Sequence, residues 1–269
     1  MSARTISAVV LARDERHHLP GCLASLVWAD EVLVVDSGSR DGTPELARAS
    51  GARVEFNPWV NYAVQRQRAL ELARGEWIFF VDADERVPPA LAAEVRRVVA
   101  SGGCEVGWWV PRRNFFPGGR EVRHSGWSPD YQLRLLRRDA AHYDPGEAVH
   151  EVARLAGAAG FLRERLIHIN YESWREFLTK QVEFARYEAR TRRATGHAAR
   201  WHNLVLQPPR AFHRRYVVWQ GWRDGLLGLW LSALMAGFDF LSWWYLWRGA
   251  PDGGHRMRSA HNGYTDTGG

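Results

Sequence analysis

The chain has 269 residues, of which 46% are hydrophobic and 25% charged, a composition typical of a globular protein and not of a disordered one. Arginine supplies nearly all of the positive charge, because Lys180 is the only lysine, and the net charge of +6 suits nucleic acid, an anionic membrane or phosphorylated substrates. The two cysteines stand in unrelated contexts, which excludes a disulfide framework and favours a reducing compartment such as the cytoplasm.

Strands and helices are predicted to alternate over the first hundred residues. Hydrophobic periodicity and cap residues predict strands over 5–12, 31–36, 53–56 and 77–81, and helices over 18–26, 44–51, 61–73 and 88–100. Thr43 is expected to cap the second helix. The first apolar run meets Arg13 too early for a secretory signal, so we expect a strand there. Strand–helix repeats of roughly 25 residues predict an α/β fold with a mainly parallel sheet.

The stretch 77–85 (WIFFVDADE) combines a buried-strand pattern with a cluster of acids. Five apolar residues predict a strand covered on both faces, and Asp82, Asp84 and Glu85 follow at its carboxyl end. Open α/β sheets bind ligands at this edge, and an Asp-x-Asp pair there can hold a hard divalent cation that neutralises a diphosphate. The alternative is a solvated acidic turn.

The ends of the first two strands are expected at the same edge of the sheet. Asp36 ends the second strand and can accept hydrogen bonds from a ribose or a base, while glycines let the following loop pass close to a ligand. Arg13, Arg66 and Arg68 offer guanidinium groups to phosphate oxygens. The alternatives are an ordinary polar turn after Asp36 and a solvated helix face for Arg66 and Arg68.

Four motifs in this order resemble family 2 glycosyltransferases of the GT-A fold, and among them the bacterial lipopolysaccharide core β-glucosyltransferases. They are A-R-D-E at 12–15, V-V-D-S-G-S-R-D-G-T at 34–43, Q-R-Q-R-A-L at 65–70 and D-A-D-E at 82–85. Two later segments, D-Y-Q-L-R-L-L-R-R at 130–138 and V-H-E at 149–151, also fit the pattern of these enzymes.

The resemblance implies inverting transfer of a hexose from a nucleotide-diphosphate sugar, with UDP-glucose the first candidate, together with Mg²⁺ or Mn²⁺. It implies a lipopolysaccharide-core or other lipid-linked acceptor. The residues that it assigns to the nucleotide sugar are Arg13, Glu15, Asp36, Ser39, Gln65, Arg66 and Asp82. The metal is expected on Asp82, Asp84 and His150.

One carboxylate must act as general base for the acceptor hydroxyl. Glu151 is our first choice, since similar enzymes have a His-Glu or Glu-Asp pair at about this distance after the metal motif. Asp130 is the alternative. His168, further along, is interpreted as a structural histidine.

Glycines, aromatic residues and arginines crowd residues 102–128, where we expect either the acceptor side of the cleft or a β-hairpin with its own aromatic core. Residues 174–193 are predicted to form an amphipathic helix. Residues 225–247 contain one charge, Asp239, and are long enough to span a bilayer. Because a mid-span aspartate facing lipid is costly, we favour a helix lying at the membrane interface over one docked on protein or on a homodimer partner.

The predicted organisation is a GT-A catalytic domain over residues 1–160, with its nucleotide-sugar half at 1–100 and its acceptor half at 101–160. A helical, membrane-associating region (161–250) and a flexible tail (251–269) follow, on an enzyme peripheral to the cytoplasmic face of the inner membrane. Two other classes compete. A nucleotidylyltransferase would need a glycine-rich signature with a lysine near the first strand, and a nucleic-acid-binding protein finds support only in the positive charge.

Overall fold

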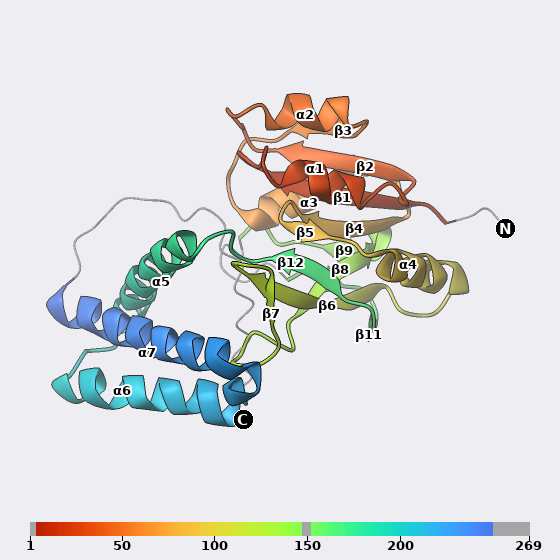
Figure 1. Cartoon of the computed structure of the whole chain (residues 1–269). Helices are drawn as coiled ribbons and strands as arrows, with labels where there is room; N and C mark the ends of the chain where they lie inside the picture. The colour runs from red at the N-terminus through yellow and green to blue at the C-terminus, as the bar shows by residue number, and fades with distance from the viewer. Residues whose placement is uncertain (1–3, 147–151, 250–269) are drawn as a thin grey trace. The chain divides into compact units, whose positions relative to one another are not determined.

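The computed structural model describes residues 4–146 and 152–249, which belong to two compact units (Figure 1). Unit 1 comprises the chain up to Arg112 together with Tyr131–His168, and unit 2 comprises Arg113–Asp130 and the chain from Ile169 onward. The sequence predicted boundaries near residues 160 and 250. The structure instead groups the segment 113–130 with the C-terminal helices, because its aromatic side chains pack there.

Unit 1 is built on a mixed sheet with the strand order β3-β2-β1-β4-β8-β6-β12-β5. Its helices and strands are β1 (Ile6–Ala12), α1 (Leu19–Ala24), β2 (Glu31–Asp36), α2 (Thr43–Ala49), β3 (Arg53–Phe56), α3 (Tyr62–Leu72), β4 (Trp77–Asp82), β5 (Glu85–Arg86), α4 (Pro89–Ser101), the first half of β6 (Gly107–Phe116), β8 (Tyr131–Arg137), η1 (Arg138–Ala140), β9 (Ala141–His142), β10 (Arg154–Leu155), β11 (Ala159–Phe161) and β12 (Leu166–Ile169). Strands β1 to β4 run parallel, and β8 and β6 add antiparallel neighbours.

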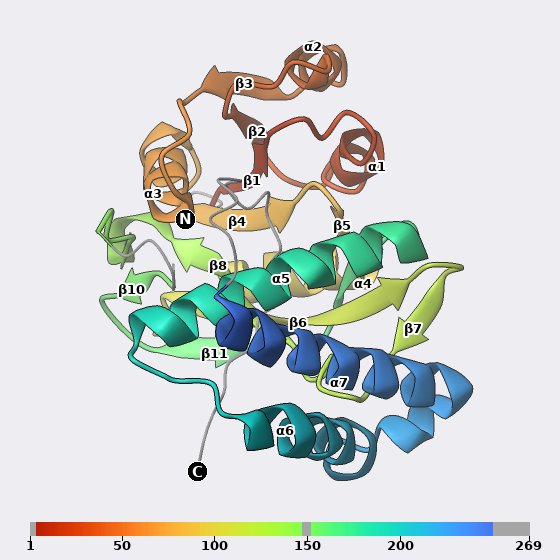
Figure 2. The ribbon, with the colours of Figure 1, turned by 90° about the vertical axis from the view of Figure 1, so that its left-hand side faces the viewer.

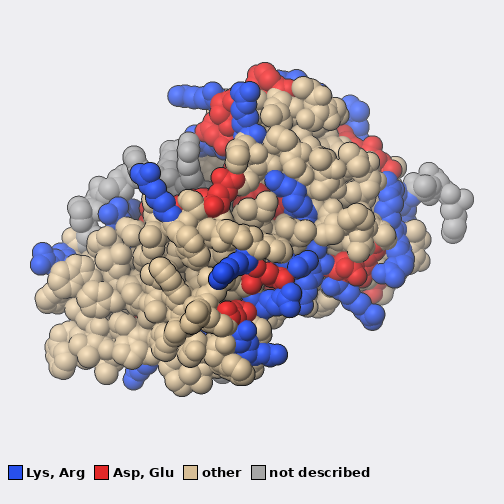
Figure 3. Space-filling view, in the orientation of Figure 1, with Lys and Arg blue, Asp and Glu red and all other residues tan. Residues whose placement is uncertain are grey.

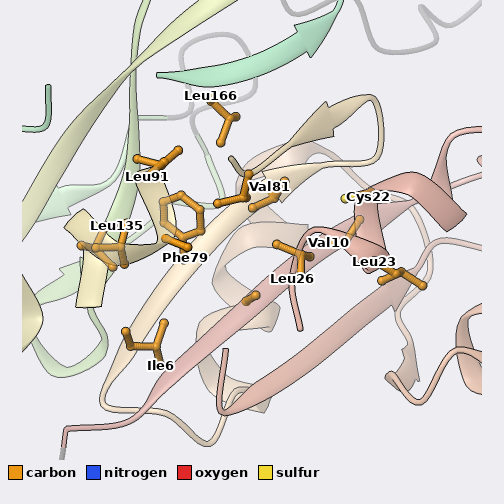
Figure 4. Close-up of a cluster of buried hydrophobic side chains, with 14 of the residues drawn as sticks. Ile6, Val10, Cys22, Leu23, Leu26, Phe79, Val81, Leu91, Leu135 and Leu166 are labelled. Atoms are coloured by element: carbon orange, nitrogen blue, oxygen red, sulfur yellow. The ribbon is translucent and has the colours of Figure 1, made fainter. Parts of the chain in front are cut away.

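Alternate residues of the central strands enter two separate cores, one on each face of the sheet. On β4, Phe79 and Val81 join the core beneath α1 and α4 (Figure 4), whereas Ile78 and Phe80 join the core beneath α3. Burial on both faces explains why this strand has the continuous apolar sequence from which it was predicted. The predicted α/β fold with a mainly parallel sheet is confirmed.

One detail of the prediction is wrong: Thr43 does not cap α2. Gly42, at a φ of 87°, occupies the N-cap position, and Thr43 is the first helical residue. Its Oγ1 instead accepts a hydrogen bond from the backbone N–H of Glu15 at 2.9 Å and donates one to Asp41. The hydroxyl therefore ties the loop after β1 to the loop after β2, which fixes two of the strand ends at the predicted ligand edge.

Unit 2 contains the hairpin of β6 with β7 (Arg120–Val122) and three long helices, α5 (Trp174–Ala194), α6 (Trp201–His213) and α7 (Gly225–Arg248). A π-helical turn, η2 (Arg214–Val218), and a short 3₁₀ helix, η3 (Gly221–Asp224), connect α6 to α7. Helix α7 packs against α5 and α6 (Figure 2). Phe116 of β6, Phe177 of α5 and Leu231 of α7 meet in one apolar core, so the hairpin and the helices share a core.

The residues Gly221–Arg248 form the one helical stretch of the described chain that is long and apolar enough to cross a membrane, by length and composition. Small residues of α7, among them Gly228, Ser232 and Ala236, are buried, while several of its bulky residues are exposed. Asp239, whose charge argued against a lipid-facing position, lies 3.5 Å from Arg192 of α5. The aspartate thus faces the protein side of the helix.

The carboxylate of Glu121 gives unit 2 a pH-dependent contribution to stability. Hydrogen bonds from Arg113, with Arg123 beside it, lower the pKa of Glu121 to about 2. Because the pKa of Glu121 is lower in the folded state than in the unfolded state, ionised Glu121 stabilises the folded state at pH values above about 4.5, its unfolded-state pKa. This contribution is lost as the pH falls toward 2. We therefore expect Glu121→Gln to cost about 1–2 kcal/mol at pH 7, after allowance for solvent screening.

Urea unfolding followed by tryptophan fluorescence at pH 7, 5, 4 and 3 measures this cost. The difference in unfolding free energy between the parent chain and Glu121→Gln should decrease below pH 4.5. Glu183→Gln, on the exposed face of α5, is the matched control and should change little at any pH. A cost for Glu121→Gln that stays constant with pH would contradict the ion-pair origin.

Candidate active site

The turn between β4 and β5 holds the three predicted acids in different environments. Asp82 is the last residue of β4, and its backbone N–H donates to Glu85 Oε2 at 2.9 Å. The side chains of Asp82 and Asp84 are 28% and 32% exposed, whereas that of Glu85 is fully buried. Only the two aspartates are therefore accessible to a ligand, and Glu85 belongs to the interior.

Glu85 is paired with two buried arginines. Arg134 Nη2 of β8 donates to Glu85 Oε1 at 2.8 Å, and Arg112 Nη1 of β6 does so at 3.3 Å. Burial raises the pKa of Glu85, which the attraction of Arg134 opposes. For Arg134, burial lowers the pKa, but Asp82 and Glu85 more than compensate, so its pKa is raised and it stays charged. Buried charges of this kind are tolerated only when paired.

Arg134 also holds Asp82. Its Nη1 donates to Asp82 Oδ1 at 3.2 Å, and its Nη2 contacts Oδ2 more closely. A guanidinium that faces both oxygens of a carboxylate fixes the orientation of that carboxylate. Asp82 therefore has a fixed orientation at the end of β4, where its carboxylate is partly exposed.

Asp84 is brought to a histidine by strand pairing. In the antiparallel β5–β12 ladder, His168 lies opposite Glu85, one residue from Asp84. His168 Nε2 is 3.5 Å from Asp84 Oδ2, and the imidazole is buried. Burial raises the pKa of Asp84, but the attraction of His168 outweighs it, so the pKa lies below its usual value. The carboxylate is thus ionised and faces an imidazole nitrogen.

A carboxylate oxygen and an imidazole nitrogen at this separation fit a divalent cation. Asp84 Oδ2 and His168 Nε2, 3.5 Å apart, are the two donors that would hold such an ion. Among the described residues, no group of three His, Cys, Asp or Glu side chains is arranged to hold a metal. One or two carboxylates suffice for Mg²⁺ in enzymes that let substrate phosphates and water complete the shell, and here Asp84 would supply the carboxylate.

The loops after β1 and β2 are joined through Ser39. Its Oγ accepts from the backbone N–H of Asp14 at 2.8 Å and donates to Asp36 Oδ1. Asp36 Oδ2 further accepts from the N–H groups of Gly38 and Ser39. Asp36 therefore closes its own loop, as the polar-turn alternative required, and its contact with a nucleoside stays a prediction. Arg13 is exposed beside this loop.

Gln65 and Arg66 of α3 are both buried, which the sequence did not foresee. Gln65 Nε2 donates to the carbonyls of Asn57 and Pro58, at 3.2 and 2.9 Å, and so fixes the segment that follows β3. The Arg66 guanidinium lies 5.3 Å from the ring centre of Phe80. The solvated-face alternative is wrong for Arg66, but holds for Arg68, which is exposed and pairs with Glu71.

The two candidates for the general base differ in what the structure says of them. Glu151, like the proposed metal ligand His150, lies outside the described residues. Asp130 precedes β8, belongs to unit 2, and its Oδ2 accepts from Asn114 Nδ2 at 3.2 Å. The choice between Glu151 and Asp130 therefore stays a prediction.

Comparison with known proteins decides the family. The model of glycosyl transferase family 2 matches residues 7–158, more than half of the chain and including both strand-end loops and the Asp82–Asp84 turn. The chain belongs to this family. It is 33% identical over 248 residues to the lipopolysaccharide core biosynthesis glycosyltransferase LpsC of Rhizobium meliloti, an alignment that covers 88% of this chain and 90% of that protein.

Solved structures match this family 2 chain more loosely. Staphylococcus aureus TarS (residues 1–349) is 16% identical, with a TM-score of 0.47 over 88% of this chain and 80% of that one. Glucosyl-3-phosphoglycerate synthase from Mycobacterium tuberculosis, in complex with Mn²⁺, UDP-glucose and phosphoglyceric acid, is 26% identical, with a TM-score of 0.38. The latter match covers 51% of this chain and 58% of that one.

The sequence did not predict that His168, Arg134 and Arg112 lie against the acids of the β4–β5 turn in this glycosyltransferase. His168 was interpreted as structural, and Arg112 was expected among arginines facing an acceptor, yet it is buried against Glu85. A signal was present for His168. Side chains alternate between the two faces of strand β12, and Leu166 and His168 both lie on its buried face. A polar side chain therefore occupies a core position.

Proposed function

We propose that the chain is an inverting, metal-dependent hexosyltransferase that uses a nucleotide-diphosphate sugar and glycosylates a lipopolysaccharide-core or other lipid-linked acceptor. UDP-glucose is the first donor to test, with ADP-heptose and UDP-galactose as alternatives. The observation that supports the proposal most is the Asp84–His168 pair at the end of β4 in a family 2 chain. The similarity to LpsC, whose name assigns it to lipopolysaccharide core biosynthesis, supports the acceptor class.

The residues divide the chemistry between them. Asp84 and His168 would hold the cation, and Asp82, oriented by Arg134, would bind the ribose or a metal-bound water. A divalent cation here supplies charge neutralisation of the departing diphosphate. The acceptor oxygen attacks the anomeric carbon, the bond from that carbon to the diphosphate oxygen breaks, and Glu151 or Asp130 takes the hydroxyl proton. One displacement inverts the configuration.

Helix α7 supports a peripheral position on the cytoplasmic face of the inner membrane, where a lipid-linked acceptor and a cytoplasmic nucleotide sugar meet. Its length and apolar composition fit an interfacial helix. Asp239 pairs with Arg192 of α5, so its carboxylate would not face the lipid. A homodimer through the same helix is the competing arrangement.

Titration calorimetry with UDP-glucose, ADP-heptose and UDP-galactose, each with and without Mn²⁺, tests the function. We expect one donor to bind, and to bind more tightly with Mn²⁺. Release of the nucleotide diphosphate on addition of a core-oligosaccharide acceptor should then fall about 10²–10⁴-fold in the variant that lacks the base.

Two variants identify the base: Glu151→Gln removes the first candidate, and Asp130→Asn removes the alternative. Normal turnover in Glu151→Gln with loss in Asp130→Asn would transfer the base to Asp130. If no nucleotide sugar binds under either metal condition, the proposed function is wrong.

A further inference from the structure

Helices α6 and α7, with the connecting turns η2 and η3, expose an unusually apolar surface, here named the α6–α7 surface and defined as residues 201–248. It lies wholly within unit 2, and α6 and α7 pack side by side (Figures 1 and 2). Exposed bulky side chains come from every one of these elements, among them Trp201, Val205, Val218, Trp222, Leu226 and Trp247. On the face seen in Figure 3, few charged side chains lie over α6 and α7.

Both carboxylates of this surface are turned inward. Residues 201–248 contain two acidic residues, Asp224 and Asp239. The side chain of Asp224 is 6% exposed and accepts from the backbone and ring nitrogens of His124, each at 2.9 Å. Asp239 is 21% exposed and pairs with Arg192. Both carboxylates of the segment therefore have hydrogen-bond or ion-pair partners within unit 2.

Four of the five arginines in the same segment are exposed, whereas Arg215 donates to the carbonyl of Ser125 at 2.9 Å. The exposed ones are Arg210, Arg214, Arg223 and Arg248. The guanidinium of Arg214 lies 5.0 Å from the ring centre of Trp219, and that of Arg248 lies 4.9 Å from Trp244. Arginine beside tryptophan is the combination that occurs at the headgroup level of a bilayer.

The neighbouring helix α5 shows that this pattern is not general in unit 2. Glu183 and Glu188 are exposed on α5, and Glu188 pairs with Arg192 at 2.6 Å. Charges of both signs on one face are typical of a helix that faces water. Helix α5 thus exposes carboxylates, whereas neither carboxylate of the α6–α7 surface is fully exposed.

We propose that the α6–α7 surface docks on an anionic lipid bilayer, with α6 and its turn in contact with lipid as well as α7. The inference deepens the proposed function, since it names the lipid partner of the C-terminal region and adds α6 to the contact. Anionic headgroups supply counter-charges to the exposed arginines, while Val205, Leu206 and Leu226 enter the apolar boundary.

Other occupants fit less well. In a two-fold dimer through this surface, the same patch meets itself, so arginines would face arginines with no outward carboxylate in the segment to pair them. A single-stranded nucleic acid would stack on aromatic rings, and aliphatic side chains such as Val205, Leu206 and Leu226 offer no such platform. Both remain outcomes of the experiment.

Flotation of the full-length protein with lipid vesicles, without donor, tests the proposal. We expect at least about tenfold more protein on vesicles of phosphatidylcholine with phosphatidylglycerol than on phosphatidylcholine alone, and a decrease at high salt. Val205→Ser with Leu206→Ser on α6 should reduce the bound fraction about tenfold, because both side chains are exposed and apolar. Val27→Ser, which removes an apolar and still more exposed side chain from unit 1, is the control and should bind normally.

Three results would overturn the proposal: equal binding to neutral and anionic vesicles, unchanged binding of the α6 double variant, or no vesicle binding at all. If the protein does not bind vesicles but self-associates or binds RNA, and the α6 double variant abolishes that binding, the surface binds a second copy of the chain or RNA instead. Failure here is distinct from failure of the proposed function. A protein that transfers sugar to a soluble acceptor but does not float refutes only the docking surface, and one that floats but binds no donor refutes only the function.

Discussion

Asp84→Asn is expected to lower sugar transfer by about 10²–10³-fold at saturating Mn²⁺, because cation stabilisation of a leaving diphosphate contributes several kcal/mol. His168→Ala should show a loss of the same order, since its Nε2 is the other proposed ligand at 3.5 Å from Asp84. In both variants, calorimetry should show that Mn²⁺ no longer strengthens binding of the nucleotide diphosphate. Loss of the ion pair alone would leave that metal effect intact.

Two controls separate ligation from a change of charge or of fold. Asp139→Asn removes an exposed carboxylate that pairs with Arg137, and His142→Ala removes an exposed histidine of β9. Both variants should retain transfer within about threefold of the parent chain, as surface substitutions usually do. If His168→Ala transfers normally while Asp84→Asn is inactive, the histidine is structural, and another side chain completes the site.

Glu85→Gln is expected to destabilise unit 1 by about 3–5 kcal/mol, because it removes the charge that Arg112 and Arg134 share in the interior. In a chain of this size, that cost lowers the melting temperature by roughly 6–20 °C. In this variant Arg134 would retain Asp82 as a partner. We therefore expect the end of β4 to keep its position but to become less rigid.

Glu55→Gln is the matched control for this experiment, since Glu55 pairs with Arg53 but is 39% exposed. We expect it to cost about 0–1 kcal/mol, the range of surface ion pairs. Urea unfolding and differential scanning calorimetry measure both variants. Equal costs for Glu85→Gln and Glu55→Gln would mean that the buried network contributes no more than a surface contact.

The sequence was sufficient to predict the parallel half of the sheet. Strands β1 to β4 combine apolar runs with turn and cap residues, and these signals act over a few neighbouring residues. Strand β4 was the most certain, since a run covered on both faces leaves a continuous apolar sequence that ends where Asp82 reaches solvent. The acids of the candidate site were predicted for the same reason.

The pairing of β5 with β12 could not be predicted, and with it the position of His168. Residues 85 and 168 lie opposite each other although 83 positions separate them in the chain (168 − 85), and no local pattern encodes such a register. The same holds for Arg112 and Arg134, whose partner Glu85 comes from a distant turn. Local patterns likewise predicted the length of α7, but not that Asp239 would turn toward Arg192 of α5.

We propose that Asp84 and His168 together hold a divalent cation against a nucleotide diphosphate. Anomalous diffraction from crystals grown with Mn²⁺ and UDP would locate that cation. We predict one manganese peak within about 2.3 Å of both Asp84 Oδ2 and His168 Nε2, with diphosphate oxygens in the same coordination shell. A peak bound elsewhere, or UDP bound with Asp84 and His168 still paired and metal-free, would contradict it.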